Sequence, residues 1–168
     1  MLSIDRLDVE LLGVLARDAR IGVVELASTL GIARNTVQSR LKRLEEAGLI
    51  AGYRPEIDLA RAGIATQAFI GLEVRQERLA PIVKALVGIP QVLEIHATTG
   101  REDLLVRVAT QTQAGLQKLI EQIVGTPGVV HSTTTLALTT PLPYRVVPLL
   151  KDFTKEAGWG RSTPAPRG

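Results

Sequence analysis

Apolar positions in the first third of the chain recur at intervals of three and four residues. This spacing places them on one face of a helix and predicts three successive amphipathic helices. The three apolar stripes are Leu7, Leu11, Val14 and Leu15, then Val23, Leu26, Ala27 and Leu30, then Val37, Leu41 and Leu44. Gly31 stands where a left-handed cap would end the second helix. Two helices joined to a third by a short Gly-containing turn indicate a helix-turn-helix.

The third predicted helix carries a basic and hydrogen-bonding face opposite its apolar stripe. Asn and Gln side chains can pair with adenine edges, whereas Arg and Lys reach guanine or phosphate. We therefore expect this helix to enter a DNA groove by its amino-terminal half, although a solvated helix surface gives the same pattern. The residues predicted to contact DNA are Arg34, Asn35, Thr36, Gln38, Ser39, Arg40, Lys42 and Arg43 of this helix, with Arg54 beyond it. Asn35, Gln38 and Ser39 are expected to read bases, and Arg40, Lys42, Arg43 and Arg54 to contact phosphates.

The residues on either side of this helix affect that prediction. Ala33 stands where Ser, Thr, Asp or Asn would ordinarily cap the helix, so its first turn lacks a side-chain acceptor. After Gly48, the stretch 49–58 predicts two short strands of the kind that form a wing.

The second half of the chain contains an internal repeat with a period of 37 residues. Residues 82–92 align with 119–129, and each copy reads as a helix ended by Gly-x-Pro and followed by a strand. An alternating strand precedes each copy. The order β-α-β-β-α-β predicts a ferredoxin-like domain with both helices on one face of an antiparallel sheet, so the fold class is α+β.

The other face of this predicted sheet mixes apolar and polar residues. Phe69 and Leu105 lie on it beside Glu94, His96 and Arg107. A four-stranded sheet covered on one side commonly buries its other side against a second copy, so we expect a two-fold dimer.

Composition adds little to the case for DNA binding. The net charge is +3, but acidic and basic residues balance through residue 140, and the whole excess lies in the last 28 residues. The argument therefore depends on the local basic face. The chain contains no Cys, and no apolar run approaches about 18 residues, so we expect a cytoplasmic protein without disulfides or a membrane contact.

Together these residues resemble the Lrp/AsnC, or feast/famine, transcriptional regulators. The resemblance covers residues 1–140 and includes two separate signatures in the family's order. The first comprises Leu7-Asp8, Asp18-Ala19-Arg20, Glu25-Leu26-Ala27, Thr36-Val37, Arg40-Leu41, Arg43-Leu44-Glu45, Gly48, Ile50 and Gly52-Tyr53, and the second is Thr99-Gly100-Arg101-Glu102-Asp103. The resemblance implies a winged helix-turn-helix followed by a RAM-type effector and oligomerisation domain. It also implies double-stranded DNA as a partner, and homodimers that often assemble into octamers.

Effector binding is a further implication of the resemblance. In similar proteins a small molecule, usually an amino acid, sits near the loop between the second and third strands. The corresponding residues are Thr98, Thr99, Gly100, Arg101, Glu102 and Asp103, with Thr134 as an added hydroxyl. Gly100 would let backbone amides approach a carboxylate, and Asp103 could hold an ammonium group. The alternative is a hairpin turn in which Gly supplies a positive φ and Asp bonds to its own backbone.

The predicted domain organisation follows. We expect a DNA-binding domain over 1–58, a linker over 59–65, an effector domain over 66–140 and an extension over 141–168. The prolines of the extension exclude a regular central strand. We expect residues 141–157 to pack on a domain or partner surface, with a short helical piece after Leu150, and 158–168 to be disordered.

An enzyme reading remains as an alternative. Sirohaem-type tetrapyrrole decarboxylases resemble this two-part architecture, and His96, Arg101 and Arg107 could bind a substrate's carboxylates. Five aromatic residues offer few flat surfaces for a macrocycle. The chain has no nucleophile motif or phosphate loop, and His96 is more typical of a structural histidine than of a metal ligand. We therefore predict a regulator without metal or cofactor. A stand-alone effector-binding module is a third reading, which the complete helix-turn-helix weakens.

Overall fold

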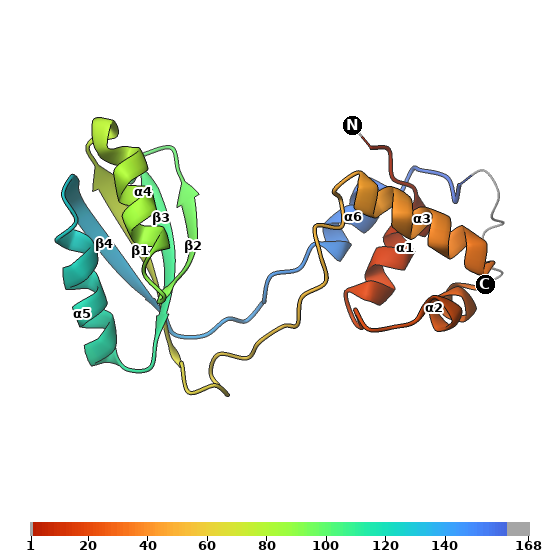
Figure 1. Cartoon of the computed structure of the whole chain (residues 1–168), viewed down its shortest axis with the longest axis horizontal. Helices are drawn as coiled ribbons and strands as arrows, with labels where there is room; N and C mark the ends of the chain where they lie inside the picture. The colour runs from red at the N-terminus through yellow and green to blue at the C-terminus, as the bar shows by residue number, and fades with distance from the viewer. Residues whose placement is uncertain (1, 161–168) are drawn as a thin grey trace. The chain divides into compact units, whose positions relative to one another are not determined.

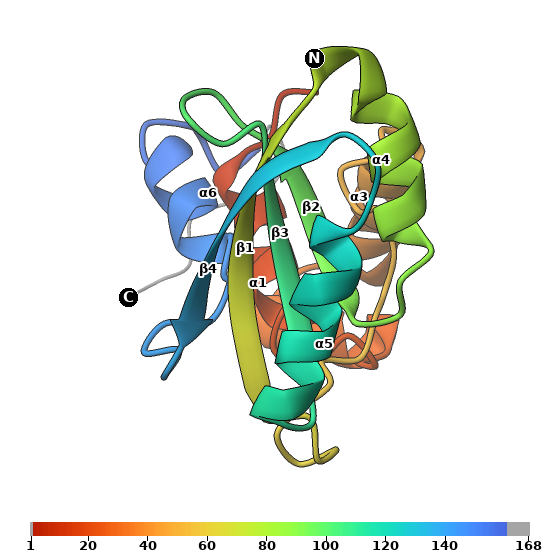
Figure 2. The ribbon, with the colours of Figure 1, turned by 90° about the vertical axis from the view of Figure 1, so that its left-hand side faces the viewer.

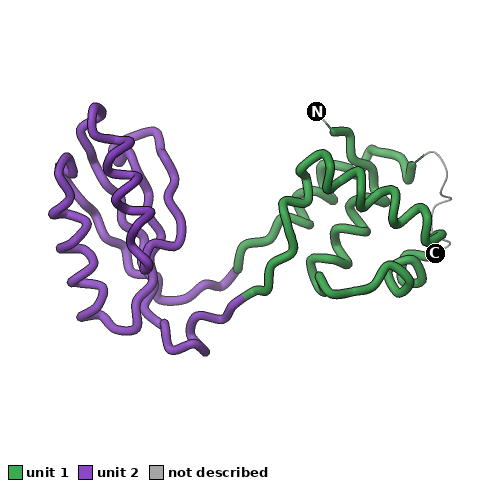
Figure 3. The backbone as a smooth tube through the Cα atoms, in the orientation of Figure 1, with its two compact units in different colours: residues 1–56, 143–168 green, residues 57–142 purple. Residues whose placement is uncertain are grey.

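The computed structural model describes residues 2–160, which form two units (Figures 1 and 3). One unit combines the chain up to Glu56 with residues from Pro143 onward, and the other runs from Ile57 to Leu142. The chain therefore passes between the units twice.

The first unit contains the predicted helix-turn-helix. Its helices are α1 (Arg6–Leu15), α2 (Val23–Leu30) and α3 (Arg34–Glu46). Asp5 caps α1, because its side chain accepts from the backbone N–H of Asp8 while the Asp8 side chain accepts from that of Asp5. Gly31 ends α2 with φ of +64°, which confirms the predicted left-handed cap. The buried side chains Leu11, Val14, Leu26, Ala27, Val37 and Leu44 form the shared core.

The prediction of two short strands over residues 49–58 is wrong. This segment is extended chain without strand pairing in the structure. The backbone N–H of Ile50 donates to the Leu44 carbonyl, and Pro55 has no N–H to donate. Neither of these two positions can therefore donate to a hairpin ladder within this segment.

The second unit has the predicted β-α-β-β-α-β order. Its elements are β1 (Thr66–Val74), a short 3-10 turn η1 (Gln76–Arg78), α4 (Leu79–Val87), β2 (Val92–Ala97), β3 (Leu104–Thr110), α5 (Gln113–Val124) and β4 (Val129–Ala137). The strands form an antiparallel sheet in the order β2-β3-β1-β4. Figure 2 shows α4 and α5 on one face of it. The alternating residues Ala68, Ile70, Leu72 and Val74 point into the core beneath those helices.

The short helical piece expected after Leu150 begins earlier in the structure, at Val147, beyond the second crossing. This helix, α6 (Val147–Phe153), contacts α1. The expectation that residues 141–157 pack on a domain surface is confirmed for α6, and that surface belongs to the helix-turn-helix unit. Residues 158–160 also contact this unit, contrary to the expected disorder at these positions, while 161–168 lie outside the described residues.

None of the helices within residues 2–160 has the length and apolar character needed to cross a bilayer.

Candidate nucleic-acid interface and effector loop

Helix α3 buries one side and exposes the other. Val37 and Leu44 are fully buried against α1 and α2, because they occupy the apolar stripe. The exposed side carries Arg34, Asn35, Gln38, Ser39 and Lys42, whereas Thr36 is half-buried. Within residues 2–160 these five side chains are exposed, so their donors and acceptors are accessible to a ligand.

Two local interactions modify this exposed face. The Ser39 hydroxyl donates to the Thr36 carbonyl at 3.1 Å, which leaves its oxygen free to accept. Lys42 lies 3.7 Å from Glu46 in an exposed pair that costs little to break. The helix begins without a side-chain cap at Ala33, as its sequence predicts.

Arg40 faces its own unit. Its Nη1 lies 2.8 Å from the Asp5 carboxylate and 2.6 Å from that of Asp8, and its side chain is only 14% exposed. The expected phosphate contact of Arg40 is therefore corrected. The sequence did not reveal this because a helical wheel cannot show that carboxylates at the start of α1 lie against this side of α3.

Arg43 shares this arrangement in part. Its Nη2 lies 2.5 Å from Asp8 and its Nη1 donates to the Ser3 carbonyl, although 42% of the side chain remains exposed. The guanidinium is thus held toward α1, and the expected phosphate contact of Arg43 competes with an internal ion pair.

These ion pairs shift the pKa values of the groups involved. Burial alone would raise the pKa of Asp8, but hydrogen bonds from the Asp5 backbone, Arg43 and Arg40 hold it below its ordinary value. Burial likewise opposes the charged form of Arg40, yet its bonds to Asp5 and Asp8 raise its pKa. Both groups are therefore charged in the folded protein at neutral pH.

The extended segment after α3 is held against this helix through Tyr53. The Tyr53 hydroxyl donates to the Glu45 carboxylate at 2.8 Å, and partial burial together with this anion raises the pKa of Tyr53 to about 12. Arg54, the next residue, is exposed. The predicted phosphate contact of Arg54 is compatible with this exposure.

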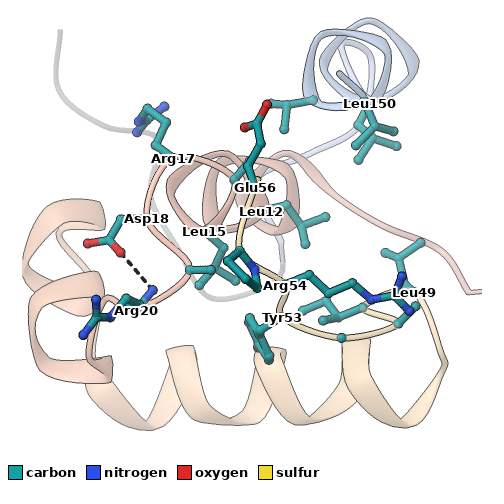
Figure 4. A pocket seen from close by; sticks show the side chains of 18 residues that line it. Leu12, Leu15, Arg17, Asp18, Arg20, Leu49, Tyr53, Arg54, Glu56 and Leu150 are labelled. Carbon is teal, nitrogen blue, oxygen red and sulfur yellow. Dashed lines mark hydrogen bonds between the residues drawn. The ribbon is translucent and has the colours of Figure 1, made fainter. Parts of the chain in front are cut away.

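A groove of about 710 Å³ lies beside this segment within the first unit (Figure 4). The end of α1, the extended segment and the start of α6 form its walls, with Leu12, Leu15 and Leu150 as apolar lining. Arg17 and Arg20 stand at its edge, where the backbone N–H of Arg20 donates to Asp18. This groove was not predicted from the sequence, because α6 comes from the far end of the chain.

The predicted effector loop joins β2 to β3 and is closed by its own hydrogen bonds. The Thr98 backbone N–H donates to the Asp103 carbonyl at 2.9 Å, and the Thr98 hydroxyl donates to the Glu102 carbonyl. Gly100 has φ of +118°, so only glycine adopts this turn without strain. Thr99, Gly100 and Arg101 are exposed at its tip.

Asp103 has neither of the two roles considered for it above, which were binding an ammonium group and bonding to its own backbone. Its carboxylate accepts from the Val74 backbone N–H at 2.8 Å and from the Gln76 side chain at 2.6 Å. Asp103 therefore holds the loop against the end of β1. Its carboxylate, which was expected to bind the ammonium group of a ligand, is already hydrogen-bonded within the chain.

Glu102 lies across the uncovered face of β1. A Cβ added to Gly71 would meet the Glu102 Cγ at 2.6 Å, so the absence of a side chain at Gly71 gives Glu102 its place. No hydrogen bond or ion pair involves the Glu102 carboxylate within residues 2–160, whereas the neighbouring Arg101 pairs with Glu73 at 2.8 Å. Gly71 and Glu73 were not predicted as part of the site.

Thr134 does not join this loop within one chain. It pairs with Ile70 in the register of β1 and β4, and so it lies on the helix side of the sheet. Its neighbour Thr133 pairs with Gly71 on the uncovered face, beside Glu102. The alternation of a strand would have favoured Thr133 once the register was known.

The residues considered for an enzyme each have a neighbour of complementary chemistry. His96 lies 3.0 Å from Glu94, Arg101 pairs with Glu73, and the Arg107 side chain donates to Gln67. Among the described residues no group of His, Cys, Asp and Glu has the arrangement of a metal site.

Comparisons with known proteins agree with both halves of this architecture. The AsnC-type helix-turn-helix domain matches residues 4–45, and the Lrp/AsnC ligand binding domain matches residues 67–147. Residues 148–160 therefore lie outside both matched segments.

Relatives of known name cover most of the chain. The HTH-type transcriptional regulator FL11 of Pyrococcus abyssi is 28% identical over 85% of this chain and 98% of its own length. The regulatory protein AsnC of Haemophilus influenzae is 30% identical over 81% of this chain and 91% of its own length.

Solved structures share the fold. Escherichia coli AsnC is 26% identical and superposes with a TM-score of 0.81 over 88% of this chain and all of that one. The regulator NMB0573 of Neisseria meningitidis, at 22% identity and a TM-score of 0.80, covers 88% of this chain and 99% of that one. Matched in both domains and in their order, this chain belongs to the Lrp/AsnC family of DNA-binding transcriptional regulators.

Proposed function

We propose that this regulator reads duplex DNA through the exposed face of α3 and responds to an amino acid held at the β2–β3 loop. The observation that carries the first part is the division of α3 into a buried stripe and a free polar face. Asn35, Gln38 and Ser39 present hydrogen-bonding groups for base edges, while Arg34 and Lys42 present cations for phosphate or guanine.

Selection from a random duplex library, followed by binding titrations, tests the DNA-reading face. Gln38→Ala should bring the affinities for selected and random duplexes closer together, because it removes a base contact. Lys42→Ala should weaken binding to both and lower the salt dependence by about one unit of slope. Lys118→Ala, on α5 of the other unit, is the matched charge control. Equal losses on both duplexes for Gln38→Ala and Lys42→Ala would contradict the division of roles.

The effector part of the proposal is supported by the loop tip and by Glu102. Exposed backbone amides around Gly100 suit a carboxylate, and the unpaired Glu102 carboxylate suits an ammonium group in place of Asp103. The Neisseria structure of the same fold is described as a complex with L-methionine, which makes amino acids the first class to test.

A thermal-shift screen against the twenty amino acids tests this site, since a ligand that binds only the folded form raises the Tm. Glu102→Gln should weaken the apparent affinity for the amino acid by about tenfold or more, and so reduce the Tm shift, because it removes the charge that faces the ammonium group. Asp152→Asn, on α6, is the matched carboxylate control. A shift that is unchanged in Glu102→Gln would contradict this assignment.

We propose in addition that two copies associate through the uncovered face of the sheet. Phe69 and Leu105 are 39% and 36% exposed at the centre of that face, which a partner would cover. A two-fold dimer would present two α3 helices to one DNA site.

A further inference from the structure

The Asp5, Asp8 and Arg40 side chains form an ion cluster between α1 and α3. Asp8 is fully buried, and the side chains of Asp5 and Arg40 are 23% and 14% exposed. Since Arg40 belongs to the recognition helix, this cluster fixes how α3 is held on α1.

The chain after the effector domain returns to this place. Lys151 of α6 pairs with Glu10 of α1 at 2.8 Å, and Thr154 at the end of α6 is 2% exposed. A side-chain methyl group of Val147 lies 3.5 Å from the position that a Cβ of Gly13 would take, an ordinary van der Waals distance, so α6 packs directly on α1 at this point.

The segment beyond α6 reaches the ion cluster itself. The Arg6 backbone N–H donates to the Gly158 carbonyl at 3.2 Å, and the Arg6 guanidinium stands 5.5 Å from the centre of the Trp159 ring. Gly160 lies directly against Arg40 and Asp5: a Cβ there would overlap the Arg40 guanidinium and stand 2.7 Å from the Asp5 carboxylate.

We propose that residues 143–160 act as an intramolecular clamp that holds α3 in its DNA-reading position by covering the Asp5–Asp8–Arg40 cluster. When residues 143–160 cover the cluster they exclude water, which can then no longer compete for the ion pairs. The ion pairs become stronger, and α3 is held more rigidly against α1. DNA affinity then depends on residues that do not touch DNA. The inference rests on the DNA-reading role proposed for α3, and Gly160 is a positioning residue in it.

Trp159 reports docking directly, because it is the only tryptophan of the chain. Gly160→Ala should release the segment, because φ of +89° at Gly160 is a conformation that other residues rarely adopt, and the added Cβ would have to displace the ion-paired Arg40 and Asp5 side chains. Gly158→Ala is the matched control, because its nearest neighbour is 4.0 Å away and its φ is not positive. Acrylamide quenching of Trp159 should increase in Gly160→Ala and remain at the wild-type level in Gly158→Ala.

DNA binding is then measured on the full chain with a duplex selected by the wild-type protein, at a temperature where circular dichroism shows each variant folded. Gly160→Ala should bind about fivefold more weakly or worse, the lower end of coupling between two sites, and Gly158→Ala should bind normally. Coupling is reciprocal, so saturating duplex should also protect wild-type Trp159 from acrylamide.

A charge exchange provides the second variant pair. Lys151→Glu should repel Glu10, expose Trp159 and weaken DNA binding, and adding Glu10→Lys should restore both signals. Normal DNA affinity in a variant whose Trp159 is exposed would overturn the clamp, and so would unchanged quenching in Gly160→Ala. Failure of the wild type to bind any duplex, with the quenching differences intact, would instead refute the DNA-reading role.

Discussion

Single residues in this protein act through partners that are distant in sequence. Asp8 illustrates this, because one buried carboxylate caps the start of α1 and also binds two arginines of α3. Removing its charge would leave the mostly buried Arg40 without its closest anion. Such a change is far more costly than losing an exposed ion pair.

The first prediction concerns this charge. Asp8→Asn should lower the free energy of unfolding by about 3 kcal/mol, because it removes one of the two carboxylates that pair with the mostly buried Arg40 and the carboxylate that pairs with Arg43. Urea titration at neutral pH measures the change. The exposed pair of Lys42 and Glu46 is the comparison: Glu46→Gln should cost less than about 1 kcal/mol. Equal costs for the two substitutions would contradict the role given to Asp8.

The pH dependence follows from the lowered pKa of Asp8. Its stabilising contribution is complete above its ordinary pKa of 3.8, and is lost as the pH falls through the lower pKa of the folded state. The difference in unfolding free energy between wild type and Asp8→Asn should therefore be constant near neutrality and narrow below that value. A difference that persists unchanged in acid would show that the cost arises from packing and not from charge.

The second prediction concerns Gly71. Gly71→Ala should displace the Glu102 side chain and reduce effector affinity with little loss of stability, because the obstructing atom belongs to a flexible side chain. In a Glu102→Ala background the same substitution should cause no further loss of effector affinity. The ligand-induced rise in Tm of the four proteins of this cycle measures the coupling. An equal loss of affinity in both backgrounds would mean that the two residues do not meet.

At the scale of elements, periodicity predicted more than local composition did. Helices α1, α2 and α3 of the first unit and the helices and strands of the second follow from apolar spacing, and Gly31 marks the end of α2. The wing strands were mispredicted because an extended, apolar-polar stretch has the pattern of a strand whether or not a pairing partner exists. The start of α6 was placed too late, because Pro148 lies in the first turn of the helix and its seven residues contain too few turns to show a period.

The third prediction uses the missing cap of α3. Ala33 is exposed, with φ of −68° and ψ of +143°, a conformation that suits a capping residue. Ala33→Ser should therefore raise the free energy of unfolding by about 1 kcal/mol, through a hydrogen bond to the first turn of α3. Urea unfolding of Ala33→Ser beside Ala33→Val, which cannot accept a hydrogen bond, measures the gain. No difference between the two would show that the first turn is already satisfied.

At the scale of the whole molecule, the exposure of some site residues could be predicted from the sequence, whereas the contacts of others could not. Which side of α3 is polar follows from a helical wheel, so the exposure of Asn35, Gln38, Ser39 and Lys42 was predictable. The partners of Arg40, Arg43 and Asp103 come from other segments. The positions of Thr134 and Gly71 depend on strand register. None of these follows from spacing within one segment.

The fourth prediction concerns association. Phe69→Asp should convert the proposed dimer to monomers, because it places a charge on the apolar centre of the uncovered sheet face. Val87→Asp, an exposed position at the end of α4, is the control and should leave the dimer intact. Light scattering on purified protein measures both masses. Dimers in Phe69→Asp together with monomers in Val87→Asp would move the interface to the helix side.

The double passage of the chain between its units constrains how the two could be exchanged. A fragment ending near Glu56 would lack α6, so no single contiguous piece contains the whole DNA-binding unit. In effect the ligand-binding domain is an insertion within the helix-turn-helix unit. Recombination that replaced this domain would need two breakpoints, one near residue 57 and one near residue 142. A chimaera joined at only the first would lack α6 and would therefore contain an incomplete helix-turn-helix unit.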